Sequence, residues 1–226
     1  MDASFACAIP GEVTDYSGEL PTVGIQVSPE DYSPHTSPVM CERSVKPGVA
    51  LFRQLVLESL GGRDVGICRP CVGSPSSDHH EGRAWDWGMN ASNPGEAARV
   101  DQLMQWLLAP SPEEEPHANF RRLGLRYMIW NRQIWSATTK EWKPYIGISE
   151  FGRPRSPHTD HVHFSFSWPG ARAETSFYDW LRGGSLPPPV EPRAPGMLLP
   201  VFLIGGGAVA GWVAATWASG RGRRRR

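Results

Sequence analysis

Two segments of the chain carry side chains that could bind a metal, and the first spans residues 77–87. There His79 stands seven residues before Asp86. If residues 82–88 form a strand, alternate side chains share a face, and the face of Asp86 otherwise carries only glycine and alanine. These small residues leave space beside the carboxylate, and His79 can fold back toward it from the preceding loop. An imidazole and a carboxylate that converge in this way are typical ligands of a catalytic zinc ion.

The second segment, residues 157–166, contains a His-x-His pair, His161 and His163. In a strand these two histidines share one face, while valine and phenylalanine side chains form the opposite, core-facing one. Two histidines on the polar face of an otherwise apolar strand need partners or a metal. A third ligand from this strand would complete three protein ligands and leave a fourth position open for water.

The two segments together resemble the LAS metallopeptidases, a group that includes lysostaphin-type enzymes, D-alanyl-D-alanine carboxypeptidases and the hedgehog signalling domain. The resemblance covers about residues 60–170 and is greatest to the carboxypeptidase-like branch. It depends on Ser77, His79, Gly82, Ala84 and Asp86 in the first segment and on His161 and His163 in the second.

The resemblance implies a zinc ion bound by His79, Asp86 and His163. It implies a small antiparallel sheet flanked by helices. The implied activity is hydrolysis of a peptide bond in peptidoglycan stem peptides, often beside D-amino acids.

Two residues are candidates for the general base. Carboxypeptidase-like members place a glutamate three residues before the last zinc ligand, and this position is Asp160 here. Other members use the first histidine of His-x-His, which is His161 here. Strand alternation favours His161, because it shares the face of His163. We expect Asp160 and His161 to act together, with the carboxylate either activating water or orienting the imidazole.

Substrate binding is assigned to Ser77 and Arg69. The carboxypeptidase-like members hold the substrate carboxylate with an arginine well before the first motif, whereas Arg69 lies only ten residues before His79. A surface charge is an equal alternative for Arg69, so both a carboxypeptidase and an endopeptidase stay open.

Two other functional classes are alternatives to a peptidase. The first is a non-catalytic zinc-stabilised module that binds the cell wall or a protein, as the hedgehog domain shows for this scaffold. The second is a structural, membrane-tethered domain without a metal.

Hydrophobic periodicity predicts an α+β domain with an antiparallel sheet. Helices are expected at residues 49–60, which two glycines end, and at 94–109. Strands are expected at 64–68, 82–89 and 161–168, and a hairpin at 125–130 and 132–135 with Asn131 near its turn.

Composition divides the chain into five parts: an extended or disordered arm (1–45), the peptidase-like domain (46–182), a proline-rich linker (183–196), a transmembrane helix (197–217) and a basic cytoplasmic tail (218–226). The positive-inside rule places the terminal arginines in the cytoplasm and the domain outside the cell membrane. No signal peptide is visible, so export requires a start upstream of Met1 or an unrecognised route; a tail-anchored protein with its body inside the cell is the alternative.

Charge and cysteine content narrow the possible partners. The formal net charge is zero, but five of the 23 basic residues are terminal arginines, and the rest of the chain is mildly acidic. This excludes a typical nucleic-acid binder, and a monomer that acts on peptidoglycan is expected.

The four cysteines (Cys7, Cys41, Cys68 and Cys71) suit an oxidising compartment. For Cys68 and Cys71 we expect a local disulfide or two buried thiols, because a redox CxxC would need a thioredoxin-like βαβ context.

Overall fold

The computed structural model describes residues 20–21, 27–42, 44–71, 75–146, 152 and 154–183. The described elements belong to one compact unit, Met1–Pro189. In chain order they are α1 (Pro47–Leu60), β1 (Arg63–Gly66), the 3-10 helix η1 (Asp78–Glu81), β2 (Ala84–Gly88), α2 (Pro94–Leu108), α3 (Ala118–Arg122), β3 (Leu125–Trp130), β4 (Gln133–Ser136), β5 (Trp142–Pro144), β6 (Val162–Phe166), α4 (Trp168–Ala171) and α5 (Ser176–Leu181).

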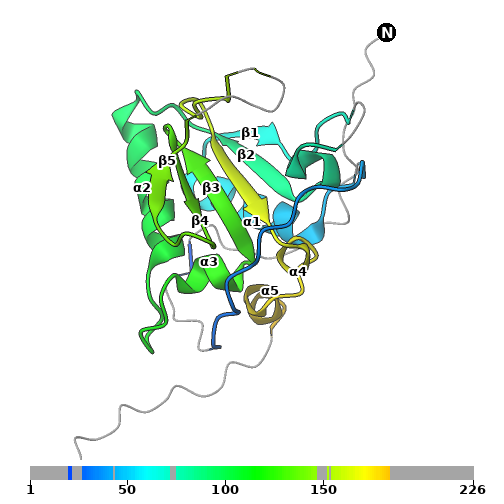
Figure 1. Ribbon diagram of the computed structural model, residues 1–226. Helices are drawn as coiled ribbons and strands as arrows, with labels where there is room; N and C mark the ends of the chain where they lie inside the picture. The colour runs from blue at the N-terminus through cyan, green and yellow to red at the C-terminus, as the bar shows by residue number, and fades with distance from the viewer. Residues whose placement is uncertain are drawn as a thin grey trace, which may run out of the picture. The chain divides into compact units, whose positions relative to one another are not determined.

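The six strands form one sheet in the order β1-β2-β6-β3-β4-β5, and every neighbouring pair is antiparallel. In Figure 1, β6 lies between β2 and β3 in the middle of the sheet, with α2 and α1 behind the strands. The predicted α+β class, with an antiparallel sheet and flanking helices, is therefore confirmed.

One face of the sheet packs against α1 and forms part of the hydrophobic core. Phe52 of α1 packs edge-on against Trp85, Phe164 and Phe166, with ring centroids 5.1–5.9 Å apart. All four of these side chains are fully buried. Burial of each large aromatic side chain contributes on the order of 2–3 kcal/mol, so this cluster fixes which face of β2 and β6 points inward. The opposite face of the same strands is left for polar side chains.

The two long helices begin and end where their sequences predict. Pro47 begins α1, and Gly61, with φ of 68°, ends it. Asn93 caps α2 by accepting hydrogen bonds from the backbone N–H groups of Gly95 and Glu96. The expected ranges 49–60 and 94–109 therefore differ from the observed helices by at most two residues at an end.

The expected strands are also present: β3 has the expected bounds, β4 is shifted by one residue, and β1, β2 and β6 are shorter than expected. The hairpin is β3–β4, and its two turn residues, Asn131 and Arg132, have φ of 43° and 66°. Such a two-residue turn matches the right-handed twist of the strands. The predicted strand at 82–89 begins only at Ala84, because Gly82 has φ of 66° and ends η1.

Residues 27–42 of the N-terminal arm contain no helix or strand but are held against the domain. Arg121 and Arg122 donate hydrogen bonds to backbone carbonyls of Val27, Pro29 and Glu30. These guanidinium groups replace the regular pairing that a strand would provide.

The cysteine pairing differs from the expected local one. Cys71 forms a disulfide with Cys41 rather than with Cys68. Cys68 is also disulfide-bonded, and Cys7 lies outside the described residues. The Cys41–Cys71 bond therefore joins the arm to the loop before η1, a long-range link that CxxC spacing does not reveal.

The described part of the chain contains no helix that is both long and apolar enough to span a membrane. The predicted membrane helix (197–217), the basic tail (218–226) and the linker beyond Gly183 all lie outside the described residues.

Candidate metal centre

The centre is built where β2 and β6 pair in the middle of the sheet. Their register places Asp86 directly opposite His163, and Trp85 opposite Phe164. Asp86 and His163 are 1% and 7% exposed. Strand alternation therefore sends a carboxylate and an imidazole to one face and their aromatic neighbours to the core, as the sequence predicts.

The third ligand-type side chain comes from η1. Ser77 caps this short helix by accepting a hydrogen bond from the N–H of His79 at 3.3 Å. Gly82 ends it in the left-handed conformation, and a Cβ atom there would lie 1.9 Å from the carbonyl oxygen of Ser44. Only glycine fits both the conformation and the close approach, which turns the chain from His79 directly into β2.

The donor atoms of the three side chains converge. His163 Nδ1 lies 2.9 Å from Asp86 Oδ1, and His79 Nε2 lies 3.2 Å from each of these two atoms. Tetrahedral zinc with bonds of about 2.0–2.1 Å separates its ligand atoms by about 3.3 Å. Among the described residues, His79, Asp86 and His163 are the group that could hold a metal ion, and their spacing fits such an ion with little movement.

The surroundings orient both imidazoles. His79 Nδ1 lies 2.6 Å from the carbonyl oxygen of Ile67, so an N–H at Nδ1 donates there and leaves the lone pair of Nε2 facing the centre. His163 stacks on the ring of Tyr127, with centroids 5.5 Å apart and planes at 22°. Partners of this kind fix the tautomer and the ring orientation of metal ligands.

The electrostatics favour an ionised carboxylate and a neutral His163. Burial by itself raises the pKa of Asp86, but the hydrogen bond from His163 and the contact with His79 outweigh it and hold this pKa well below its usual range. Burial lowers the pKa of His163, although Asp86 opposes this shift. A metal needs these deprotonated forms as ligands.

Both candidate bases lie beside the triad and contact each other. His161 Nε2 is 3.8 Å from Asp86 Oδ1, and His161 Nδ1 is 2.8 Å from Asp160 Oδ1. The side chains of His161 and Asp160 are 13% and 79% exposed. The hydrogen bond from His161 lowers the pKa of Asp160. The carboxylate thus lies behind the imidazole, whose Nε2 faces the centre, and this geometry suits an orienting role for Asp160.

A fourth histidine, His158, forms a buried wall of the centre. Its ring lies 4.7 Å from that of His161 and 5.9 Å from that of His163. Burial, reinforced by the nearby His163, lowers the pKa of His158 to about 4. The residue is therefore neutral near pH 7. Its φ of 51° turns the side chain inward in a way that sequence spacing does not indicate.

The two residues assigned to substrate binding have other contacts as well. Arg69 forms an ion pair with Asp86 Oδ2, while 52% of its side chain is exposed. It therefore holds the carboxylate oxygen that faces away from the histidines and leaves Oδ1 for a metal. Ser77 contacts the site through the N–H of His79. Both residues border the centre, and their assignment to substrate stays a prediction.

A buried network of charged side chains holds η1, the short helix that carries His79, in place. Arg83 binds Asp78 at 2.7 Å and Glu81 at 2.5 Å, and Arg126 binds Asp78 at 3.3 Å. Glu81 also accepts hydrogen bonds from two backbone N–H groups of the arm, at 2.7 and 3.0 Å. The Glu81 carboxylate is therefore 0% exposed and fully paired, although a glutamate beside loop histidines would ordinarily be solvated.

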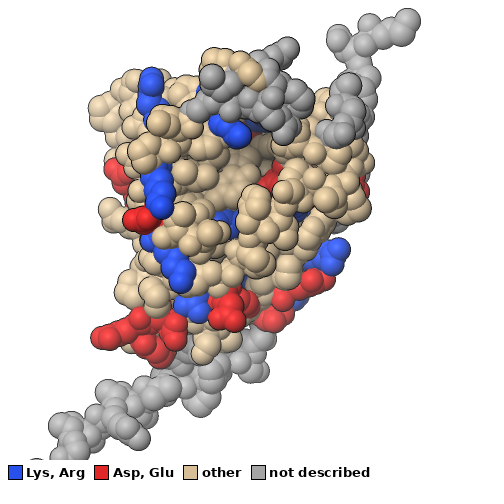
Figure 2. Space-filling model, in the orientation of Figure 1, with Lys and Arg blue, Asp and Glu red and all other residues tan. Residues whose placement is uncertain are grey.

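A groove of about 400 Å³ runs along β3 and β4 next to the centre. Tyr127, which stacks on His163, and Ile129, which pairs with it, line one end. Arg126 and Arg155 also line the groove. Figure 2 shows that this face of the molecule is hollowed near its middle. Arg126 is already paired with Asp78, so the exposed Arg155 is the cation that a negatively charged, extended ligand would meet in this groove.

Comparisons with known proteins give one family. No curated protein and no solved structure matches the chain. A family model described as "VldE, C-terminal domain" matches residues 41–162, more than half of the chain. The matched range contains His79, Asp86, Asp160 and His161, and it ends one residue before His163. The chain therefore belongs to the VldE C-terminal domain family.

Proposed function

We propose that the chain is a zinc-dependent peptidase that cleaves peptidoglycan stem peptides, with a scaffold of the LAS metallopeptidase type. The observation that carries the proposal is the convergence of three buried ligand atoms beside an imidazole that a carboxylate orients. A structural zinc site uses four protein ligands, whereas three leave a position for water or substrate. The pair His161–Asp160 lies where a proton must be moved in hydrolysis.

The roles of the residues follow from their positions. His79, Asp86 and His163 would hold the ion, and Arg69 keeps the second Asp86 oxygen occupied. When bound, zinc supplies a Lewis acid that polarises a carbonyl group and acidifies water. Hydrolysis adds a hydroxyl group to the carbonyl carbon and a proton to the departing amine nitrogen. His161 Nε2 accepts the proton of the water and returns it to that nitrogen, while Asp160 stabilises the imidazolium through Nδ1.

The groove supports a peptide substrate. It lies beside His163 and carries an exposed guanidinium group, Arg155, and one aromatic wall, Tyr127. A stem peptide is extended and carries free carboxylates that such groups bind. The groove suits either a terminal or an internal bond, so a carboxypeptidase and an endopeptidase both belong to the proposal.

The proposed location is the outer side of the cell membrane, with the segment 197–217 as the anchor. The Cys41–Cys71 disulfide supports it, because such bonds persist in oxidising compartments. A protease added to intact cells should degrade the domain. Protection of the domain until the cells are lysed would place it inside.

Zinc content and cleavage of purified muropeptides test the function together. The wild-type chain should contain one zinc per chain by elemental analysis and release a peptide or amino acid that mass spectrometry identifies. His79→Ala should lose both the metal and the activity. His80→Ala is the matched control, since His80 neighbours the ligand but its side chain accepts a hydrogen bond from the N–H of Ser76 and lies outside the ligand group.

One set of outcomes would favour the non-catalytic alternative. Full zinc occupancy without cleavage of any muropeptide, and no functional change in His161→Ala, would indicate a zinc-stabilised binding module. Metal that persists in His79→Ala would overturn the ligand assignment itself.

A further inference from the structure

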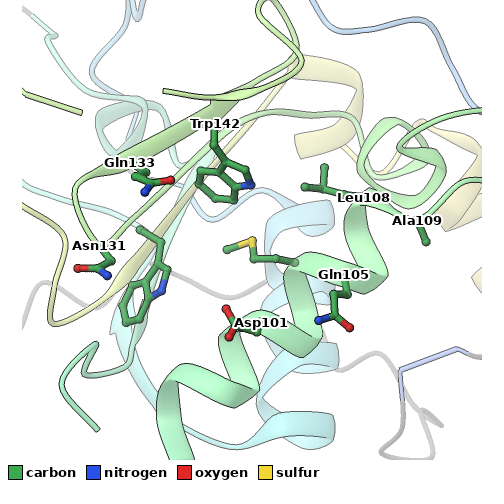
Figure 3. Close-up of a pocket in the computed structure, with 9 residues that line it drawn as sticks. Asp101, Gln105, Leu108, Ala109, Asn131, Gln133 and Trp142 are labelled. Atoms are coloured by element: carbon green, nitrogen blue, oxygen red, sulfur yellow. The ribbon is translucent and has the colours of Figure 1, made fainter. Parts of the chain in front are cut away.

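A second hollow, of about 550 Å³, lies on the other face of the sheet, between α2 and the strands β3, β4 and β5. Figure 3 shows Trp142 and Asp101 on opposite sides of this hollow, with Asn131 and Gln133 along one flank and Gln105 along another. Because neighbouring side chains of a strand alternate between faces, Trp130 and Gln133 point here while Ile129 and Ile134 line the groove of the metal centre. The two hollows are therefore separate sites.

Two indole rings line this second hollow, together with the smaller apolar side chains of Met104, Leu108 and Ala109. Trp130 is 9% exposed and Trp142 is half-buried. Neither indole N–H has a hydrogen-bond partner among the residues that the structure describes, so both donors are available to a ligand. An indole offers a flat apolar surface and one donor at its edge, which are the contacts that the C–H face and the hydroxyl groups of a pyranose require.

Four polar side chains surround the indoles: Asp101, Gln105, Asn131 and Gln133. All four are exposed, and within the described ranges none makes a side-chain hydrogen bond or ion pair. The contrast with the first turn of α2 is clear, because Asn93 and Glu96 are engaged in capping. A carboxylate accepts two hydrogen bonds from neighbouring hydroxyl groups, and an amide both donates and accepts.

The charge of the lining decides between classes of ligand. None of the nine lining residues is a lysine, arginine or histidine, and one is an aspartate, so phosphate-bearing or carboxylate-bearing ligands would meet repulsion without compensation. A purely apolar ligand would not use the four polar groups. From the paired indoles and the ring of unpaired polar groups, we propose that this hollow is a binding site for a neutral saccharide.

The proposed saccharide site is joined to the metal centre by the backbone. The N–H of Asn131 donates to the carbonyl of His158 at 2.7 Å, and that of Arg132 donates to the carbonyl of Pro157 at 2.8 Å. The turn that carries Asn131 thus holds the loop that carries His158. Saccharide binding does not depend on metal or catalysis, so this inference stands or falls apart from the proposed peptidase activity.

Calorimetric titration of the full chain tests the site, in a detergent whose head group is not a sugar. The probes are two neutral trisaccharides, N,N′,N″-triacetylchitotriose and cellotriose, titrated with and without a chelator. Binding of at least one, unchanged by the chelator, is the expected result; binding of only one identifies whether an acetamido group is required. No binding of either at millimolar concentration would overturn the proposal.

Two variant pairs locate the site. Trp142→Ala should weaken binding about tenfold or more, whereas Trp180→Ala, at another half-buried tryptophan, should not. Gln105→Ala and Gln102→Ala compare two exposed glutamines of α2, of which only Gln105 lines the hollow. Because both glutamines are exposed, these variants fold even if Trp142→Ala does not. Equal weakening by Gln102→Ala and Gln105→Ala would contradict the assignment.

Discussion

Asp160 and His161 differ in exposure and in distance from the ligands, and this difference predicts unequal effects of substitution. His161 faces the centre, so His161→Ala should lower kcat by about 10²-fold or more. Asp160 acts through the imidazole, so Asp160→Asn should lower kcat by about tenfold and leave KM and zinc content unchanged. Steady-state cleavage of a defined muropeptide, with elemental analysis of each variant, measures both. Loss of zinc in Asp160→Asn would show that the carboxylate is a ligand instead.

Tyr127 makes one contact with its hydroxyl group and another with its ring, and a substitution by phenylalanine removes only the first. Its hydroxyl donates to Asp78 at 2.9 Å, and its ring stacks on His163. Burial, together with the nearby Asp78 charge, raises the pKa of Tyr127, so the hydroxyl remains a donor at all ordinary pH values. Tyr127→Phe should therefore cost about 1–3 kcal/mol of unfolding free energy in urea, because Asp78 loses a partner, while zinc content stays the same.

A matched control for that variant is Tyr145→Phe. The Tyr145 hydroxyl receives only a long contact of 3.4 Å from Arg155, and it is part of the exposed groove. Its removal should change the unfolding free energy by less than about 0.5 kcal/mol. Equal destabilisation by the two variants would argue against a special role for the Tyr127–Asp78 bond.

At the scale of elements, one substitution in the turn between β3 and β4 should stabilise the fold. Arg132 has φ of 66°, which costs a non-glycine residue about 1 kcal/mol. Its contacts to Pro157 and Tyr145 use only the backbone. Arg132→Gly should keep them and raise the unfolding free energy by roughly 0.5–1 kcal/mol in urea titrations. A decrease would mean that the arginine side chain itself stabilises the turn.

Sequence periodicity predicted the central strands well because their two faces differ so strongly. Asp86 alternates with tryptophans, and His163 alternates with valine and phenylalanine, so parity alone assigns each side chain to the site or to the core. The pairing of β2 with β6 then brings the two ligands together. The register of such strands is strongly specified, because a shift of one residue would move the buried side chains to the polar face.

Other features depend on contacts that are distant in sequence and could not be predicted in this way. The strand β5 has three residues, and α3, α4 and α5 have four to six, too few to show a period. Glu81 is buried because the arm covers it, 41 and 42 residues away. His158 faces the centre because two backbone bonds from the hairpin turn hold its loop. None of these partners is adjacent in the sequence.

At the scale of the molecule, the metal should stabilise the whole fold. The three ligands come from η1, β2 and β6, so an ion bound by the folded state alone joins elements that are far apart in the chain. Such binding adds RT ln(1 + [L]/Kd), about 4 kcal/mol at a thousandfold excess over Kd. A chelator should lower the unfolding temperature of the wild type and leave that of His79→Ala unchanged. Equal sensitivity to the chelator would show that the ion binds elsewhere.

The Cys41–Cys71 disulfide joins the arm to the segment that carries His79, and its removal should affect both. The cysteines are 30 residues apart, and closure of a loop of this length stabilises a fold by about 3–4 kcal/mol. Next to it, the N–H of Glu42 donates to the carbonyl of His80 in η1 at 2.8 Å. A double substitution of both cysteines by serine should therefore lower the unfolding free energy by roughly that amount and weaken zinc binding, measured by competition with a chelator of known affinity. If stability falls while zinc affinity is unchanged, the arm stabilises the fold without positioning His79; if neither changes, the disulfide does not constrain the arm.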